Sequence, residues 1–207
     1  MKCGTLLAAL AVAALGLGAW PSATEAQPKS STTYTYYTVS GKTAGEIFNA
    51  MLRQGPKVNG MKSFASTSMT TLQKGYLEPG KSCQIKGYAL QLNFVTKLPR
   101  VANEKALPAA DLARWRQFSQ MVKIHEATHR SIWLDCAASV ERQTRALKAS
   151  SCGEFNRKVE QIWQTARAAC TQRHASFERS EYARMIKHPF ARVVARKDMK
   201  TRAAALR

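Results

Sequence analysis

Residues 121–136 read MVKIHEATHRSIWLDC and contain the pattern H-E-x-x-H, with His125, Glu126 and His129 at its fixed positions. Residues four apart lie on one face of an α-helix, so both imidazoles can converge on one metal ion with Glu126 beside them. This arrangement is typical of zinc hydrolases, in which the glutamate accepts a proton from a metal-activated water. We therefore predict that His125 and His129 bind one zinc ion and that Glu126 is the catalytic base. The alternative is a chance match on an amphipathic helix, with packed or solvated histidines.

The residues around the motif continue the helical pattern in both directions. Pro108 marks a helix start, and apolar residues recur at helical spacing until about residue 149. The sequence SSCG at 150–153 is typical of a turn, after which Glu154 begins a second helix that ends near Met185. Two long helices joined by so short a turn predict an antiparallel helical hairpin that carries the H-E-x-x-H motif.

The first half of the chain has the pattern of a sheet. Residues 33–39 alternate threonine and tyrosine, and two further strands are expected within 62–76 and 83–96, joined by the hairpin signal EPGK at 78–81. Thr43 and Glu46 form a capping box for one short helix, and LPR at 98–100 ends the region. The predicted fold class is therefore α+β, with a small antiparallel sheet and one short helix followed by the helical hairpin.

The N-terminus has the pattern of a signal peptide. Lys2 precedes an apolar run from Leu6 to Trp20, and the small residues at 23–26 offer a cleavage site. An uncleaved anchor is the alternative, but no stop-transfer flank follows the run, which is short for a membrane span. We expect a secreted or periplasmic protein without a transmembrane span in its mature chain. Its predicted parts are a signal peptide (1–26), a single metallopeptidase-like domain (27–187, with a sheet half at 27–107 and a helical half at 108–187) and a basic tail (188–207).

Four cysteines remain after signal-peptide removal, which predicts two disulfides in an oxidising compartment, with three connectivities open. A zinc site built from cysteines is the alternative, although no C-x2-C spacing occurs. Cys136 and Cys170 lie at similar distances from the turn, so a bridge between them would fix the register of the two helices. That register would leave Cys83 to pair with Cys152.

A catalytic zinc needs a third protein ligand, and the same register suggests where to look for it. Cys136 follows His125 by 11 residues, and counting 11 residues onward from Cys170 reaches Glu181. The intervening helix face also carries His174 and Glu178. Because long side chains lean toward the N-terminus of their own helix, we predict Glu181 as the third metal ligand and keep Glu178 as its substitute. Both could instead be ordinary solvated helix carboxylates.

The net charge of +19 suggests an anionic partner. Residues 183–207 contain eight lysines and arginines against one aspartate, so this tail could bind an anionic envelope surface. A solvated, frayed basic helix explains the same charge. Secretion makes nucleic acid the weaker candidate.

The sequence resembles a bacterial family of predicted secreted zinc-dependent proteases, otherwise described as a domain of unknown function. The likeness rests on YTVSGKT at 37–43, GP at 55–56, Cys83, LPR at 98–100, Trp115, the H-E-x-x-H motif, Cys152 and FERSE at 177–181. Of these features, the H-E-x-x-H motif alone is specific. The resemblance implies peptidase activity, with His125 and His129 as metal ligands, Glu126 as the base and a further matching position at Glu181.

We therefore expect a secreted zinc-dependent metallopeptidase that hydrolyses peptide or protein substrates. A non-enzymatic, basic envelope-binding module with a structural or vestigial metal site is the alternative. An amidase that acts on cell-wall peptides could use the same residues.

Overall fold

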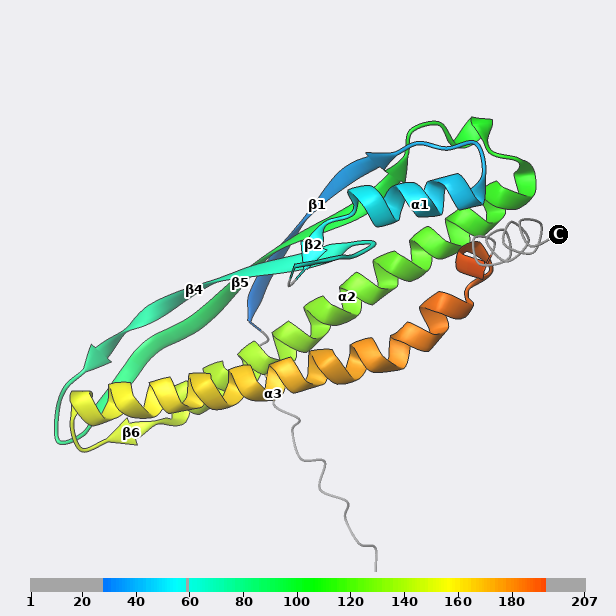
Figure 1. Cartoon of the computed structure of the whole chain (residues 1–207). Coiled ribbons are helices and arrows are strands. Elements are labelled where there is room, and N and C mark those ends of the chain that lie inside the picture. The colour runs from blue at the N-terminus through cyan, green and yellow to red at the C-terminus, as the bar shows by residue number, and fades with distance from the viewer. Residues whose placement is uncertain (1–27, 59, 193–207) are drawn as a thin grey trace, which may run out of the picture.

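The computed structural model describes residues 28–58 and 60–192 of the chain. They form an α+β fold with a mixed sheet, three α-helices and one 3-10 turn (Figure 1). The predicted signal peptide and most of the predicted basic tail lie outside the described residues. Within the described ranges, no helix combines the length and the apolar character that crossing a membrane requires.

The main sheet is mixed, which corrects the prediction of an antiparallel sheet. Its order is β1-β5-β4; β4 is antiparallel to the central strand β5, whereas β1 is parallel to it. Strands joined by a tight turn must be antiparallel, but a helix and three strands separate β1 from β5, so the chain can return in the same direction. The strands are β1 (Lys29–Val39), β4 (Ser66–Glu78), β5 (Cys83–Val101), the short β6 (Lys148–Ala149) on β5, and a separate hairpin of β2 (Lys57–Val58) and β3 (Met61–Lys62).

Strand β5 is longer than the sequence pattern indicated, because it runs through the LPR segment. Pro99 lies inside this strand and pairs with Tyr37 of β1. A proline cannot donate to a ladder, so it normally occupies an edge. Pro99 lies beyond the last pair with β4, Ser66–Lys97, where β5 has a neighbour on one side alone among the described strands. A proline is therefore compatible with this end of β5.

The short helix α1 (Ala44–Gln54) begins where the capping box predicted. The Thr43 hydroxyl accepts a hydrogen bond from the backbone N–H of Glu46 at 3.2 Å, and the Glu46 carboxylate accepts one from Lys42 N–H at 2.7 Å. A third contact comes from another helix, since the Asp111 carboxylate accepts from Ala44 N–H at 2.9 Å. Capping thus fixes α1 against the start of the helix that carries the motif.

Two long helices, α2 (Ala109–Ala146) and α3 (Cys152–Lys187), run along the sheet (Figure 1). The 3-10 turn Glu104–Ala106 precedes α2, and β6 lies in the short connection to α3. Contacts between the two helices occur in opposite order along them: His129 meets Glu178, and further on Cys136 meets Cys170. Both predicted disulfides, Cys136–Cys170 and Cys83–Cys152, are present.

The largest core cluster lies where α1 and the start of α2 meet the sheet. It is rich in aromatic rings, and Phe190 is fully buried in it, with its ring centroid 5.0 Å from that of Phe118 and 5.7 Å from that of Trp115. Phe190 lies in the basic tail predicted from the sequence (188–207), where one apolar residue among cations gives no periodic signal. The packed domain extends at least to this residue.

Part of β5 lacks a neighbouring strand on the side of β1. The pairing of β5 with β1 begins at Gln91 and β6 covers Cys83 and Gln84, so residues 85–90 of β5 have no strand partner on that side within the described residues. Side chains from α2 bind it instead: the Glu141 carboxylate accepts from Leu90 N–H at 2.9 Å, and Arg145 donates to the Tyr88 carbonyl at 2.7 Å. Glu141 is 5% exposed and forms an ion pair with Arg145. Together the two side chains replace a strand at this edge.

Candidate metal centre

The motif residues lie on the stripe of α2 that faces the interior. His125 and Glu126 are each 5% exposed and follow Trp115, Phe118 and Val122 at helical spacing along this stripe. In an ordinary amphipathic helix these positions would be apolar. Burying an imidazole and a carboxylate there is unfavourable unless each finds a polar partner.

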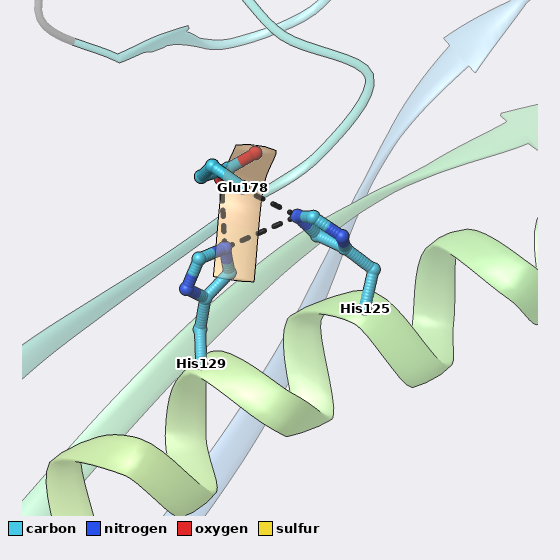
Figure 2. A group of neighbouring side chains, drawn as sticks. All are labelled: His125, His129 and Glu178. Carbon is cyan, nitrogen blue, oxygen red and sulfur yellow. Dashed lines mark hydrogen bonds and ion pairs between the residues drawn. The ribbon is translucent and has the colours of Figure 1, made fainter. Parts of the chain in front are cut away.

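Three donor atoms from α2 and α3 converge at this point (Figure 2). His125 Nε2 and His129 Nε2 lie 3.1 Å apart, and Glu178 Oε1 lies 2.9 Å from His129 Nε2 and 3.4 Å from His125 Nε2. The histidines are four residues apart on α2, whereas Glu178 reaches them from α3. Among the described residues, this is the single group of three His, Cys, Asp or Glu side chains close enough to share a metal ion.

The spacing of these donors fits zinc. Ligand atoms about 2.0–2.1 Å from a tetrahedral zinc lie about 3.3–3.4 Å from one another, so the observed separations would have to open by about 0.5 Å or less. Two imidazoles and one carboxylate are also a donor set that catalytic zinc uses. The residues present therefore fit this ion in number, chemical type and separation.

Each histidine presents its other ring nitrogen to α3. His125 Nδ1 lies 3.8 Å from Glu181 Oε2, and His129 Nδ1 lies 2.8 Å from His174 Nδ1. His174, Glu178 and Glu181 follow one another at i, i+4 and i+7, so a single face of α3 supplies all three contacts. His129 Nδ1 therefore has a hydrogen-bond partner in His174, whereas His125 Nδ1 is buried without one among the described residues, with Glu181 beyond hydrogen-bond distance.

Glu126 points to the sheet side of the cluster. Its carboxylate accepts a hydrogen bond from the Thr67 hydroxyl at 2.7 Å, and Thr67 in turn lies 3.1 Å from the hydroxyl of Thr96 on β5. Burial raises the pKa of Glu126, although the bond from Thr67 and the nearby histidines oppose that rise. A raised pKa brings a carboxylate closer to the range in which it can take up and release a proton.

The imidazoles and the carboxylate of the cluster shift one another's pKa values. Hydrogen bonds from His125 and His129 lower the pKa of Glu178, which stays ionised. Burial opposes protonation of His125, but the hydrogen bond and the negative charge of Glu178 outweigh it and raise the pKa of His125. Burial and the nearby His129 lower the pKa of His174 to about 4, so this ring is uncharged at neutral pH.

A cleft of about 610 Å³ leads to the donors. Helix α2 contributes the stripe from Val122 to Trp133, α3 contributes residues between Thr171 and Met185, and the segment 63–67 at the start of β4 forms the opposite wall. No lysine or arginine of the described residues lines this cleft, although the chain carries a net charge of +19. The three converging donor atoms are therefore accessible from a groove between β4 and α3.

The structure brings together most of the side chains predicted from the sequence. His125, Glu126 and His129 cluster, but Glu178 and not Glu181 brings its carboxylate oxygen into the group of three donors. Counting from Cys170 by the distance of His125 from Cys136 reaches Glu181, whereas counting by the midpoint of the two histidines, nine residues, reaches residue 179, next to Glu178. The contact of Thr67 with Glu126 had no sequence signal, because threonine is ordinary in a strand.

The comparisons with known proteins give one family and no individual relative. Residues 34–184 match the family model described as "Bacterial protein of unknown function (DUF922)". Neither the curated proteins nor the solved structures contain a match. The matched region runs from β1 into α3 and includes all the side chains of the candidate metal centre. Its description names no activity, so kinship with zinc-dependent proteases stays a prediction.

Proposed function

This chain belongs to the DUF922 family of bacterial proteins, and we propose that it is a zinc-dependent peptidase. In this proposal His125, His129 and Glu178 hold the ion, and Glu178 replaces Glu181 as the third ligand. The observation that carries the proposal is the convergence of three donor atoms within 3.4 Å of one another at the base of an open cleft. A secreted or periplasmic location stays an expectation from the predicted signal peptide, and two disulfides agree with it.

Zinc would supply Lewis acidity and a water of lowered pKa. Glu126 is the residue to accept a proton, because its carboxylate lies beside the donors, is 5% exposed and has a raised pKa. Thr67 holds one oxygen of that carboxylate, which keeps it in place and leaves the other oxygen for proton transfer. Glu181 lies outside the group of three donors: its carboxylate forms an ion pair with Arg184 and is 3.8 Å from His125 Nδ1, beyond hydrogen-bond distance.

The groove suits an extended substrate. The stripe from Val122 to Trp133 spans about 16 Å of α2, enough for about five residues of an extended chain at 3.3 Å each. Among the described strands β4 pairs with β5 alone, so its other edge is free, and Ser66 and Thr67 at its start line the cleft. A peptide could therefore add to β4 through backbone hydrogen bonds and cross the metal-binding atoms.

The competing proposal, a basic envelope-binding module with a structural metal, has less support. Structural zinc sites are closed by four protein ligands, whereas catalytic sites use three and keep one position accessible. Three donors converge here in the described residues, and the cleft reaches them.

The test compares Glu126→Gln with the wild type and with Glu160→Gln, a control at an exposed glutamate on α3. We expect Glu126→Gln to bind zinc with wild-type stoichiometry and to lose about 10²–10⁴-fold in peptide hydrolysis, because the amide cannot accept the proton. The control should keep both properties. Undiminished hydrolysis by Glu126→Gln would remove the proposed base. Stoichiometric zinc in a wild type that cleaves no member of a peptide library would favour the binding module.

A further inference from the structure

The contact between His129 and His174 constrains where protons lie around the metal centre. The two Nδ1 atoms are 2.8 Å apart, which is a hydrogen-bond distance. A neutral imidazole carries its proton on one nitrogen and has a lone pair on the other. One proton therefore lies between the two rings, and it belongs either to His129 or to His174.

Metal binding decides between these two arrangements. His129 Nε2 is the nitrogen that faces His125 and Glu178, so the lone pair that a metal needs must be on Nε2. Neutral His129 then has its proton on Nδ1 and donates it toward α3. The Nδ1 of His174 must accept this proton, which requires His174 to be uncharged and to carry its own proton on Nε2.

The surroundings of His174 suit this task. Its ring packs against Trp133, with centroids 4.8 Å apart, and against His129, with centroids 5.0 Å apart, so its orientation is fixed. Its Nε2 is buried without a protein partner among the described residues, so a proton on this atom costs free energy that the bond from His129 and metal binding have to outweigh. Its Nδ1 approaches the outer nitrogen of His129 and not the three converging donors, which places His174 behind a ligand rather than among the ligands.

We propose that His174 is a positioning residue that accepts the Nδ1 proton of His129 and thereby holds His129 in the tautomer whose Nε2 binds the metal. This inference rests on the proposed metal centre. Partners of this kind fix the ring orientation and tautomer of a metal-binding histidine, and their loss typically weakens metal binding about 10–100-fold. They are usually carboxylates, backbone carbonyls or waters, whereas here the acceptor is a second imidazole.

The test uses two replacements of similar size that differ in hydrogen bonding. In His174→Asn, the side-chain oxygen can occupy the place of Nδ1 and accept the same proton, whereas His174→Leu has no acceptor. Zinc affinity, measured by competition with a chromophoric chelator, should fall about 10–100-fold in His174→Leu and should recover most of that loss in His174→Asn. Gln172→Leu is the control, because Gln172 is exposed on the same helix and is not among the residues that line the cleft.

Two further measurements separate positioning from a loss of structure. Thermal unfolding of the metal-free variants reports whether His174→Leu still folds, and the visible spectrum of cobalt-loaded protein reports the coordination of the ion. In zinc-loaded wild type, ¹⁵N NMR of the His129 ring should show a proton on Nδ1 and metal on Nε2.

Three results would overturn the inference. The first is equal zinc affinity in wild type and His174→Leu; this result would remove the role of His174 but would not contradict the proposed metal centre. The second is equal weakening in His174→Asn and His174→Leu. The third is NMR evidence that metal occupies Nδ1 of His129. A wild type that binds no zinc would remove both the metal centre and this role of His174.

Discussion

The Cys136–Cys170 disulfide should contribute to zinc binding as well as to stability. It joins α2 and α3 seven residues after His129 and eight residues before Glu178, which is about 10–12 Å along each helix axis. It is the covalent link nearest to the place where α3 brings Glu178 to the histidines. Replacing both cysteines by alanine tests whether this link fixes the position of that glutamate.

The size of the stability effect follows from the loop that the bond closes. A sequence separation of 34 corresponds to about 3.8 kcal/mol of unfolded-state entropy, and the separation of 69 for Cys83–Cys152 corresponds to about 4.4 kcal/mol. Each bond also has a well-buried cysteine, Cys170 at 1% and Cys83 at 2% exposure. The two double-alanine variants should therefore lose similar free energies of unfolding.

Zinc binding should separate these two variants. Loss of Cys136–Cys170 lets α3 shift along α2, so Glu178 must be ordered when the ion binds, and the affinity should fall at least about tenfold, or 1.4 kcal/mol. Loss of Cys83–Cys152, which ties the end of β5 to the start of α3, should leave the affinity near that of the wild type. Urea unfolding of the metal-free proteins and chelator competition supply the two measurements.

The outcome that refutes this reasoning is specific. If both double variants lose similar stability and neither loses zinc affinity, the disulfide does not control the position of Glu178. If both lose affinity equally, the cause is general destabilisation and not the register of the two helices.

Three further predictions concern single residues. Phe190→Ala should lower the free energy of unfolding by about 3–5 kcal/mol, since a fully buried ring is removed, whereas Ile186→Ala, at a half-exposed position, should have little effect in the same urea titration. Thr67→Val keeps the shape of the side chain but removes the hydrogen bond to Glu126, which is worth about 1.5–3 kcal/mol for a charged acceptor. Peptide hydrolysis should therefore slow while zinc stoichiometry stays unchanged, and equal rates in the variant and the wild type would contradict the role given to Thr67. Burial, and secondly the charge of Arg184, lower the pKa of His188 from its usual 6.5, and its Nδ1 accepts from Phe190 N–H. Below pH 6.5 the His188 imidazole therefore binds a proton more readily in the unfolded chain, and the stability that neutral His188 supplies is lost as the pH falls toward its folded-state pKa. When unfolding is measured at pH 7.5 and pH 5, the free energy of unfolding should fall less in His188→Gln than in the wild type.

The parts of the fold that depend on local spacing were predictable from the sequence. The capping box at Thr43 places α1, and the i, i+4 spacing of His125 and His129 places both rings on one face. The cysteine count predicted two disulfides but left three connectivities open, and the similar distances of Cys136 and Cys170 from the turn favoured the pairing that the structure has.

The features that depend on distant contacts were not predictable in the same way. The direction of β1 is set by the path of the chain through α1 and three strands, and strand composition carries no information on that path. To choose between Glu178 and Glu181, the position of α3 along α2 has to be known to within one helical turn. The contact from Thr67 to Glu126 joins a strand to a helix 59 residues away and leaves no periodic pattern.

The Glu141–Arg145 pair has a consequence for how this chain behaves in solution. Without it, the stretch near Leu90 would present an open row of amide and carbonyl groups, which is a template on which another molecule can grow a cross-β assembly. Glu141 and Arg145 occupy one backbone N–H and one backbone carbonyl of this row, so an incoming strand would have to displace both side chains before it could pair with β5 here.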